Sequence, residues 1–358
     1  MPSLKEIKGR INSISSTLAI TSAMKMVAAA KLQKAQMAIQ NMLPYERRLH
    51  SMLIDLMGAM NISAAASEDG SVRGSGSAER GFDQSGDRLS LSNRHDLAWM
   101  DGAYSLMAQR EVRKVAIVAF ASNSSLCGAF NSNVIREATA VINEYRASGL
   151  GDADITVYSV GRKMAEAMKK LGFPSPADFT KMSDSPSYEA ASALAQELLD
   201  GFVSGRFDKV ELVYNHYKST SSQPTIRQTY LPLSLADATA DIQVGKITDS
   251  ASESDTNRVA EPVGAPVVRQ GSPTTEDLIV EPSKEALIAT LLPKVIRLRI
   301  FTTLLDSAAA EHAARTVAMQ LATDNGNDLL QELTLEYNKG RQQKITSEIL
   351  DLVGGSMQ

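Results

Sequence analysis

Residues 20–36 read ITSAMKMVAAAKLQKAQ, with three lysines, no acidic residue, and methionines set among alanines. The stretch belongs to a longer segment, between Glu6 and Glu46, that contains no acidic residue at all. Apolar residues in this segment recur every three or four positions, which predicts the seam of a coiled coil. The seam positions, most of them apolar, are Ile7, Ile11, Ile14, Leu18, Thr21, Lys25, Ala28, Leu32, Ala35, Ile39 and Met42. The sequence therefore predicts a long basic helix that pairs with a second helix.

A second apolar stripe, through Ile20, Met24 and Val27, runs beside this seam. A helix with apolar residues on two faces is expected to contact two neighbours. The first 45 residues also carry six lysines and arginines against Glu6 alone, although the formal net charge of the whole chain is −4. Such local asymmetry predicts an acidic partner or an anionic surface for this helix.

The composition of the chain limits its class. With 358 residues, 43% of them hydrophobic and 22% charged, it is expected to be a soluble protein with room for two domains. No run approaches the roughly 20 apolar residues that a membrane-spanning helix needs. The single cysteine, Cys127, excludes an internal disulfide and fits a reducing compartment.

Changes in composition divide the chain into five segments. We predict an N-terminal coiled-coil helix at 1–62 and a C-terminal coiled-coil helix at 278–358. The segments 63–98 and 237–277 are rich in small and polar residues without periodicity, which predicts two flexible insertions. Between them, 99–236 alternates strand and helix patterns and is expected to form an α/β domain with a largely parallel sheet and an antiparallel edge.

Seven elements are expected in the α/β domain. Strands are predicted at 112–120, 153–160, 209–217 and 224–233, and helices at 131–146, 162–171 and 187–203. The loop 121–131, ASNSSLCGAFN, lies between a strand and a helix, where free backbone N–H groups can bind an anion. It lacks the glycine spacing of the known nucleotide-binding loops, so a tight turn that requires Gly128 is the favoured interpretation.

Residues with catalytic or metal-binding chemistry form no convincing group. Cys127 is interpreted as a buried structural thiol, because the histidines are scattered and none is paired with it. His312 has no second metal ligand one helical turn away. We therefore predict no catalytic residue, no metal and no cofactor in this chain.

Two terminal blocks resemble a known family. The segment at 20–36 resembles the first long helix of the F-type ATP synthase γ subunits, and AEHAARTVAMQLATDNGNDLLQELTLEYNKGRQQKITSEILDLVGG (310–355) resembles their last helix. The central SSLCGAFN is similar to the family's Gly-Leu-Cys-Gly-Gly-Phe-Asn turn, with Ser125 and Ala129 in place of two glycines. The resemblance covers most of the chain but not residues 63–95 and 237–275, both longer than usual.

The resemblance implies a fold and a function. The fold class is α/β, in which the two terminal helices form a long antiparallel coiled coil and the central domain is Rossmann-like. The implied function is that of a rotating central stalk, which couples proton flow through the membrane ring to ATP synthesis or hydrolysis in the α3β3 catalytic core. Implied partners are the α and β subunits, the ε subunit and the membrane c-ring, with no nucleic acid. The implied location is peripheral, at the cytoplasmic face of a bacterial inner membrane.

The resemblance also assigns contact residues. Those expected to contact the α and β subunits are Met24, Lys25, Lys31, Lys34, Arg315, Arg341, Gln342, Thr346 and Asp351. The family has glutamate where Asp351 stands, so this contact is expected to be shorter. The tail expected to sit in the apolar sleeve of the catalytic barrel comprises Ile345, Ile349, Leu350, Leu352 and Val353. Contacts of the α/β domain, as a foot, with ε and the c-ring are assigned to His216, Tyr217, Lys218 and Ser219.

Two other interpretations share some of these features. A non-rotary coiled-coil scaffold would have the same long helices but would not require the specific terminal blocks. A nucleotide-dependent enzyme would use the loop 121–131, and it predicts nucleotide binding by the purified chain.

Overall fold

A computed structural model describes residues 3–59, 106, 109–233 and 284–355. The predicted insertions at 63–98 and 237–277 lie outside the described residues. So do the predicted domain boundaries at 99, 236 and 278.

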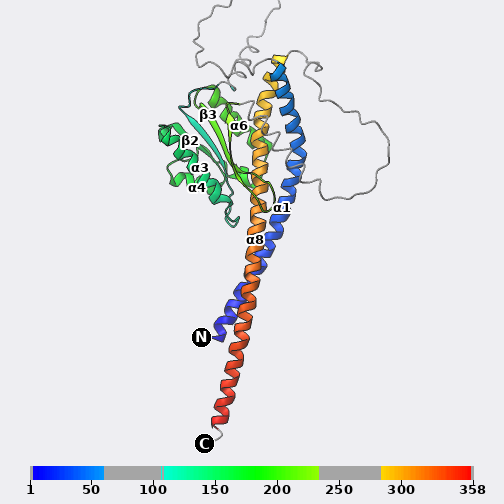
Figure 1. The fold of residues 1–358 in the computed structure, drawn as a ribbon, viewed down its shortest axis with the longest axis vertical. Helices are drawn as coiled ribbons and strands as arrows, with labels where there is room; N and C mark the ends of the chain where they lie inside the picture. The colour runs from blue at the N-terminus through cyan, green and yellow to red at the C-terminus, as the bar shows by residue number, and fades with distance from the viewer. Residues whose placement is uncertain (1–2, 60–105, 107–108, 234–283, 356–358) are drawn as a thin grey trace, which may run out of the picture.

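Two long helices run antiparallel along the molecule (Figure 1). Helix α1 spans Leu4–Ala59 and helix α8 spans Lys284–Gly355, and each continues through an internal proline, Pro44 and Pro293. Every one of the eleven predicted seam positions in α1 is buried or half-buried. The predicted antiparallel coiled coil is therefore confirmed, and its seam lies where the three- and four-residue spacing predicts it.

Small residues set the register of this coiled coil. Thr323 of α8 donates a hydrogen bond to Thr21 of α1, with 3.1 Å between their Oγ1 atoms. A methyl group at Gly340 would lie 3.2 Å from Leu4 Cδ2. Leu4 and Thr21 are separated in α1 by the same number of residues as their partners Gly340 and Thr323 in α8. An antiparallel pair of helices requires this equality. The N-terminus of α1 thus lies opposite Gly340, and the rest of α8 extends past it.

A four-stranded sheet forms the centre of the α/β domain. Its strands are β1 (Val115–Phe120), β2 (Ile155–Val160), β3 (Lys209–Asn215) and β4 (Thr225–Leu231). They lie in the order β2-β1-β3-β4, with β1 parallel to β2 and β3, and β4 antiparallel to β3. The predicted parallel sheet with an antiparallel edge is confirmed, although each strand is shorter than predicted.

Helices cover both faces of the sheet. On one face lie α3 (Phe130–Ala147) and α4 (Arg162–Lys170), which enclose one apolar core. On the other face lie α6 (Tyr188–Val203) and the N-terminal part of α8. They enclose a second apolar core, which also includes the last turns of α1. Two short elements, the 3-10 turn η2 (Asp152–Asp154) and helix α5 (Thr180–Asp184), were not predicted because they span too few residues for a periodic pattern.

Alanines allow the helices and the domain to approach each other closely. Ala309 and Ala313 of α8 pack against Leu32 of α1, while Ala310 packs against Cys127 of the loop after β1 and Phe130 at the start of α3. Small side chains on several sides of one helix leave room for neighbours on each side. The middle of α8 is therefore held between α1 and the sheet (Figure 1).

Candidate functional site: an exposed two-helix shaft

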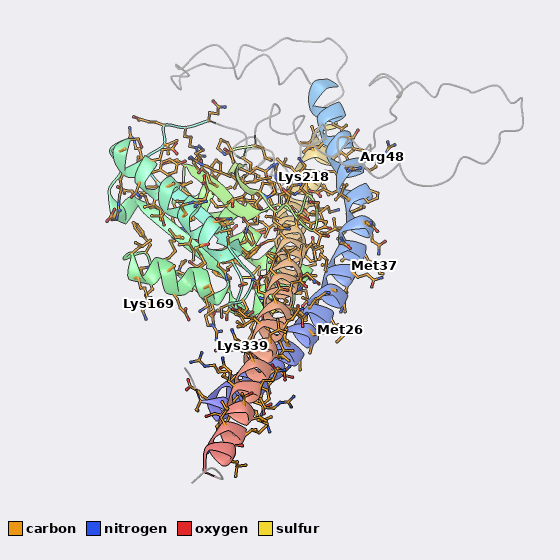
Figure 2. All side chains as sticks on the ribbon, turned by 60° about the horizontal axis from the view of Figure 1, so that its bottom comes forward. Met26, Met37, Arg48, Lys169, Lys218 and Lys339 are labelled. Atoms are coloured by element: carbon orange, nitrogen blue, oxygen red, sulfur yellow. The ribbon has the colours of Figure 1, made fainter. Side chains whose placement is uncertain are left out.

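We call residues 4–34 of α1 and 310–355 of α8 the shaft, most of which extends beyond the α/β domain (Figure 1). The side of α1 that faces away from α8 is apolar and open to solvent. Ile20, Met26, Val27 and Met37 are exposed there, Met26 by 65%. Figure 2 shows Met26 and Met37 pointing away from α8. Part of the second stripe predicted from the sequence thus has no partner among the residues that the structure describes, and Met24 is half-buried.

The end of α8 continues as a single helix. Because α1 begins opposite Gly340, residues 341–355 of α8 extend past it for about 22 Å. Every residue from 341 to 350 is exposed. The exposed apolar side chains here are Ile345, Ile349, Leu350 and Leu352. Asp351 and Val353 belong to the helix, but their side chains lie outside the described part of the structure. A concentration of exposed apolar residues marks an interaction surface rather than an ordinary protein surface.

Most polar residues assigned to partner contacts also lie on the outside. Lys31 and Lys34 are exposed, and Lys25 is half-buried. Arg341 and Gln342 are exposed near the end of α8, where the Thr346 hydroxyl donates to the Gln342 carbonyl oxygen at 2.9 Å. These residues are placed so that another subunit can reach them, and the contacts themselves stay predictions.

Arg315 differs because it already has partners within the chain. Its guanidinium pairs with Glu311 Oε1 at 2.8 Å and donates to Ser124 Oγ at 2.7 Å. Burial raises the pKa of Glu311, while the charge of Arg315 lowers it in part. The pKa of His312 is lowered to about 4 by burial, and further by Arg315 and Lys31, so this histidine is neutral at pH 7. Nothing in the sequence predicted that Arg315 ties α8 to the loop after β1.

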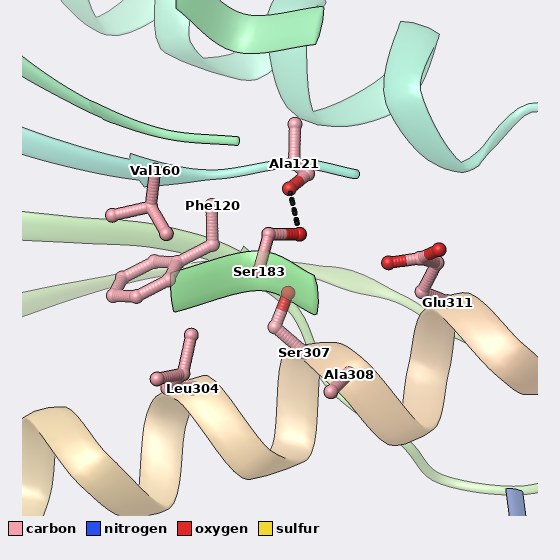
Figure 3. Close-up of a pocket in the computed structure, with 8 residues that line it drawn as sticks. All are labelled: Phe120, Ala121, Val160, Ser183, Leu304, Ser307, Ala308 and Glu311. Atoms are coloured by element: carbon pink, nitrogen blue, oxygen red, sulfur yellow. Dashed lines mark hydrogen bonds between the residues drawn. The ribbon is translucent and has the colours of Figure 1, made fainter. Parts of the chain in front are cut away.

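The same junction contains a small cavity, shown in Figure 3. Leu304, Ser307, Ala308 and Glu311 line it from α8, and the ends of β1 and β2 line it from the sheet. Ser183 closes one side, where its hydroxyl donates to the Ala121 carbonyl oxygen at 3.0 Å. The cavity has room for about one water molecule, so it is too small for a nucleotide.

The loop at 121–131 is closed by its own side chains. Asn131 accepts from the Ser122 backbone N–H at 3.0 Å, and its Nδ2 lies 3.1 Å from Cys127 Sγ. Cys127 is 1% exposed, which confirms its interpretation as a buried thiol. Gly128 adopts a φ of +58°, the left-handed region that favours glycine, so the predicted tight turn at this residue is confirmed.

The four residues assigned to foot contacts fall into two pairs. His216 and Tyr217 lie against the coiled coil: His216 Nδ1 is 2.6 Å from Asp306 Oδ2, and Gln36 Nε2 donates to the Tyr217 hydroxyl at 2.6 Å. The Asp306 carboxylate raises the pKa of His216 through this hydrogen bond. Lys218 and Ser219 are exposed. The sequence could not predict the contact with α8, because Asp306 is 90 residues away from His216 along the chain.

Other kinds of site are limited within the described residues. They contain no group of three histidine, cysteine, aspartate or glutamate side chains arranged to hold a metal ion. Their helices include none that combines the length and the apolarity needed to cross a membrane. The shaft is thus the feature of the described chain that most clearly calls for a partner.

Comparison with known proteins identifies the family. The model of the ATP synthase family matches residues 3–357. A curated relative from Phocaeicola vulgatus, an ATP synthase gamma chain, is 47% identical over the full length of both chains. The chain belongs to the ATP synthase gamma-chain family. Further members include gamma chains of Bacteroides thetaiotaomicron, 45% identical over the full length of both, and of Flavobacterium johnsoniae, 36% identical over 99% of this chain and 98% of that one.

Solved structures of lower identity share the fold. The rotor of the Euglena gracilis mitochondrial ATP synthase in rotational state 1 gives a TM-score of 0.51 at 18% identity, covering 96% of this chain and 98% of that one. A second Euglena gracilis structure, with F1 and the c-ring in rotational state 3, gives 0.52 at 16% identity, covering 99% and 93%. The resemblance seen in the sequence is confirmed, and as a gamma chain this protein is a subunit of an ATP synthase. The non-rotary scaffold is not favoured.

Proposed function

We propose that this gamma chain is the rotating central stalk that couples proton flow through the membrane ring to ATP synthesis and hydrolysis in an α3β3 core. The observation that carries the proposal is the shaft, which leaves apolar residues exposed along α1 and on the single-helix end of α8. A shaft of this kind fits inside a barrel of larger subunits, where a second set of neighbours covers those residues.

Contacts with the barrel would use both helices of the shaft. On α1 they would involve Met24, Lys25, Lys31 and Lys34, and on α8 Arg315, Arg341, Gln342, Thr346 and Asp351. Because Arg315 donates to Ser124, a partner that reaches Arg315 would also meet the loop after β1. Acidic segments of β are the expected partners of the lysines, which lie in a stretch of α1 that contains no acidic residue.

These contacts must be weak enough for the shaft to turn. An exposed ion pair contributes about 0–1 kcal/mol, so no single lysine holds the shaft at one angle. Methionines such as Met24 and Met26 have flexible thioethers that adapt to different surfaces. A shaft whose sides differ would contact each β subunit differently, and only such differential contacts can shift a β subunit between two states.

The end of α8 would serve as the pivot. Ile345, Ile349, Leu350, Leu352 and Val353 would sit in an apolar sleeve at the far end of the barrel. Full burial of one such side chain contributes about 1.5–3 kcal/mol. The apolar end of α8 can keep this contact while it rotates, because the hydrophobic effect has no preferred direction.

The α/β domain would form the foot at the membrane side. Its contacts with the ε subunit and the c-ring would use the exposed Lys218 and Ser219, beside His216 and Tyr217, whose side chains are engaged with the coiled coil. The complex would lie at the cytoplasmic face of a bacterial inner membrane. The gamma chain itself would carry out no phosphoryl transfer, which would remain in the α3β3 core.

The test combines purified α and β subunits with and without this chain, then measures co-elution and ATP hydrolysis together. We expect one copy of the chain to enter the complex and hydrolysis to depend on it. A matched control is the chain truncated after Gly340, which should bind less tightly because it lacks the pivot. Hydrolysis that is unaffected by the full chain, with separate elution, would contradict the proposal.

A further inference from the structure

The turn after β3 contacts both α1 and α8. We call His216, Tyr217, Asp306 and Gln36 the shaft lock. These residues come from three separate parts of the chain: the turn after β3, the middle of α8, and α1. Gln36 and Asp306 lie at about the same level of the coiled coil, since Thr21 faces Thr323 and the two helices run in opposite directions.

Asp306 holds the turn to α8 with both carboxylate oxygens. Oδ2 lies 2.6 Å from His216 Nδ1, and Oδ1 accepts from the Tyr217 backbone N–H at 2.9 Å. The His216 and Asp306 side chains are both largely shielded from water. Two hydrogen bonds to one carboxylate fix the distance and also the angle between the turn and the helix.

Tyr217 extends this attachment to α1. Its ring packs in the two alanine-lined clusters that contain Ala309, Ala310 and Ala313 of α8. Its hydroxyl then accepts a hydrogen bond from Gln36 Nε2 at 2.6 Å. One side chain of the α/β domain therefore contacts both helices at the same level.

The remaining contacts of the domain with the coiled coil include a large apolar core around Leu292, Ile296 and Ile300. A close-packed apolar core resists sliding as well as separation. Directional hydrogen bonds add a preferred angle between the domain and the helix axis, and outside the shaft lock Arg315 donates one such bond to Ser124. The shaft lock lies below that core, toward the free end of the shaft.

We propose that the shaft lock fixes the rotational position of the α/β domain on the two-helix shaft, so that torque passes between them without slip. This inference rests on the proposed function as a rotor. Asp306 is its central positioning residue, and Tyr217 connects it to α1. The inference assigns His216 and Tyr217 a role inside the chain in place of the foot contact expected from the sequence.

The experiment uses the complete ATP synthase in vesicles and measures protons pumped per ATP hydrolysed. We expect Asp306→Ala to lower this ratio at least twofold while hydrolysis stays within about twofold of the unmodified complex. Tyr217→Phe removes the bond to Gln36 and keeps the ring, so it should lower the ratio by a smaller factor. The control is Asp152→Ala, an exposed aspartate whose carboxylate pairs with Arg146 within the α/β domain.

A second readout separates positioning from loss of stability. Spin labels at Lys34→Cys on α1 and Lys169→Cys on α4, both exposed positions, report the distance between the shaft and the domain in the full chain. The native Cys127 is buried and is therefore slow to label. We expect Asp306→Ala to broaden this distance distribution, and Tyr217→Phe to broaden it less, with the helical content unchanged. If Asp306→Ala fails to fold, the Tyr217→Phe variant tests the proposal by both the pumping ratio and the distance distribution.

The outcomes distinguish the two proposals. An unmodified chain that leaves hydrolysis by α3β3 unaffected would overturn the rotor function itself. If the unmodified complex pumps, and both variants pump at its ratio with an unbroadened distance distribution, the shaft lock is wrong while the rotor function stands.

Discussion

The upper and lower parts of α8 have opposite relations to water. Between residues 288 and 319 its apolar side chains are mostly buried, as at Leu304, which is 2% exposed. Between residues 321 and 352 many are exposed, as at Leu335, which is 66% exposed. Both parts belong to one unbroken helix. The apolar pattern of a helix therefore does not determine which of its residues form a core, because its neighbours decide.

The number of neighbours explains the difference. The upper part of α8 lies between the sheet and α1, so two elements cover it. Among the described residues, only α1 remains beside α8 below the domain, and no described helix lies opposite it past Gly340. Exposure increases in these same two steps. Under the proposed function, the exposed part is the part that other subunits would cover.

The largest effect should come from matched leucine truncations in the two parts. Leu304→Ala should lower the free energy of unfolding by about 2–5 kcal/mol, because it opens a cavity in the core. Leu335→Ala should change it by less than about 0.5 kcal/mol in the free chain. Urea unfolding of both variants measures the difference. Equal losses would mean that the lower part of α8 is buried in solution.

Hydrogen exchange at the single-helix end should change next most. A lone helix of this length is marginally stable in water, so residues 341–355 should exchange rapidly in the free chain. Addition of the α3β3 core should slow exchange there by at least about tenfold, a change of about 1.4 kcal/mol. The upper part of α8 serves as the internal control, since it is already covered by the domain. Unchanged exchange at 341–355 would remove the pivot from the proposed function.

Two glycines in the lower part allow a smaller and more specific test. Alanine favours a helix over glycine by about 1 kcal/mol. Gly340→Ala should therefore stabilise the coiled coil by about 0.5–1 kcal/mol, since its methyl group would lie 3.2 Å from the flexible end of Leu4. Gly326→Ala should gain less, because its methyl group would lie only 2.6 Å from Leu18 Cδ2. Thermal unfolding followed by circular dichroism ranks the two, and the reverse order would contradict the register.

The smallest effect should be the pH dependence of the contact between His216 and Asp306. The Asp306 carboxylate raises the folded-state pKa of His216, while burial and the charge of Lys218 lower it in part. The contribution of the charged pair is thus complete below pH about 6.5 and is lost as pH rises through the raised pKa. Relative to His216→Gln, the unmodified chain should lose less than about 1 kcal/mol of unfolding free energy over that window. A constant difference between the two chains from pH 5 to pH 9 would show that His216 is not charged in this contact.

The long helices and the sheet could be predicted from the sequence because their signals are local and repeated. The seam in α1 extends over many turns, and β1, β2 and β3 read as short apolar strands separated by helix patterns. Family membership could also be predicted, since the terminal blocks are long and specific. The short helix α5 could not, because five residues hold no period.

For the candidate site too, some features could be predicted from the sequence and others could not. The sequence by itself determined that α1 is basic and apolar on two sides, and that the end of α8 is apolar, because composition and spacing are properties of the chain alone. Only the tertiary structure decided that Arg315 bonds Ser124, and that His216 and Tyr217 face Asp306 and Gln36. These pairs are far apart in sequence, and no periodic pattern encodes them. A side chain's partner depends on where the whole fold brings distant segments together. For that reason the packing of the fold, more than the sequence pattern, determined the partners of these residues.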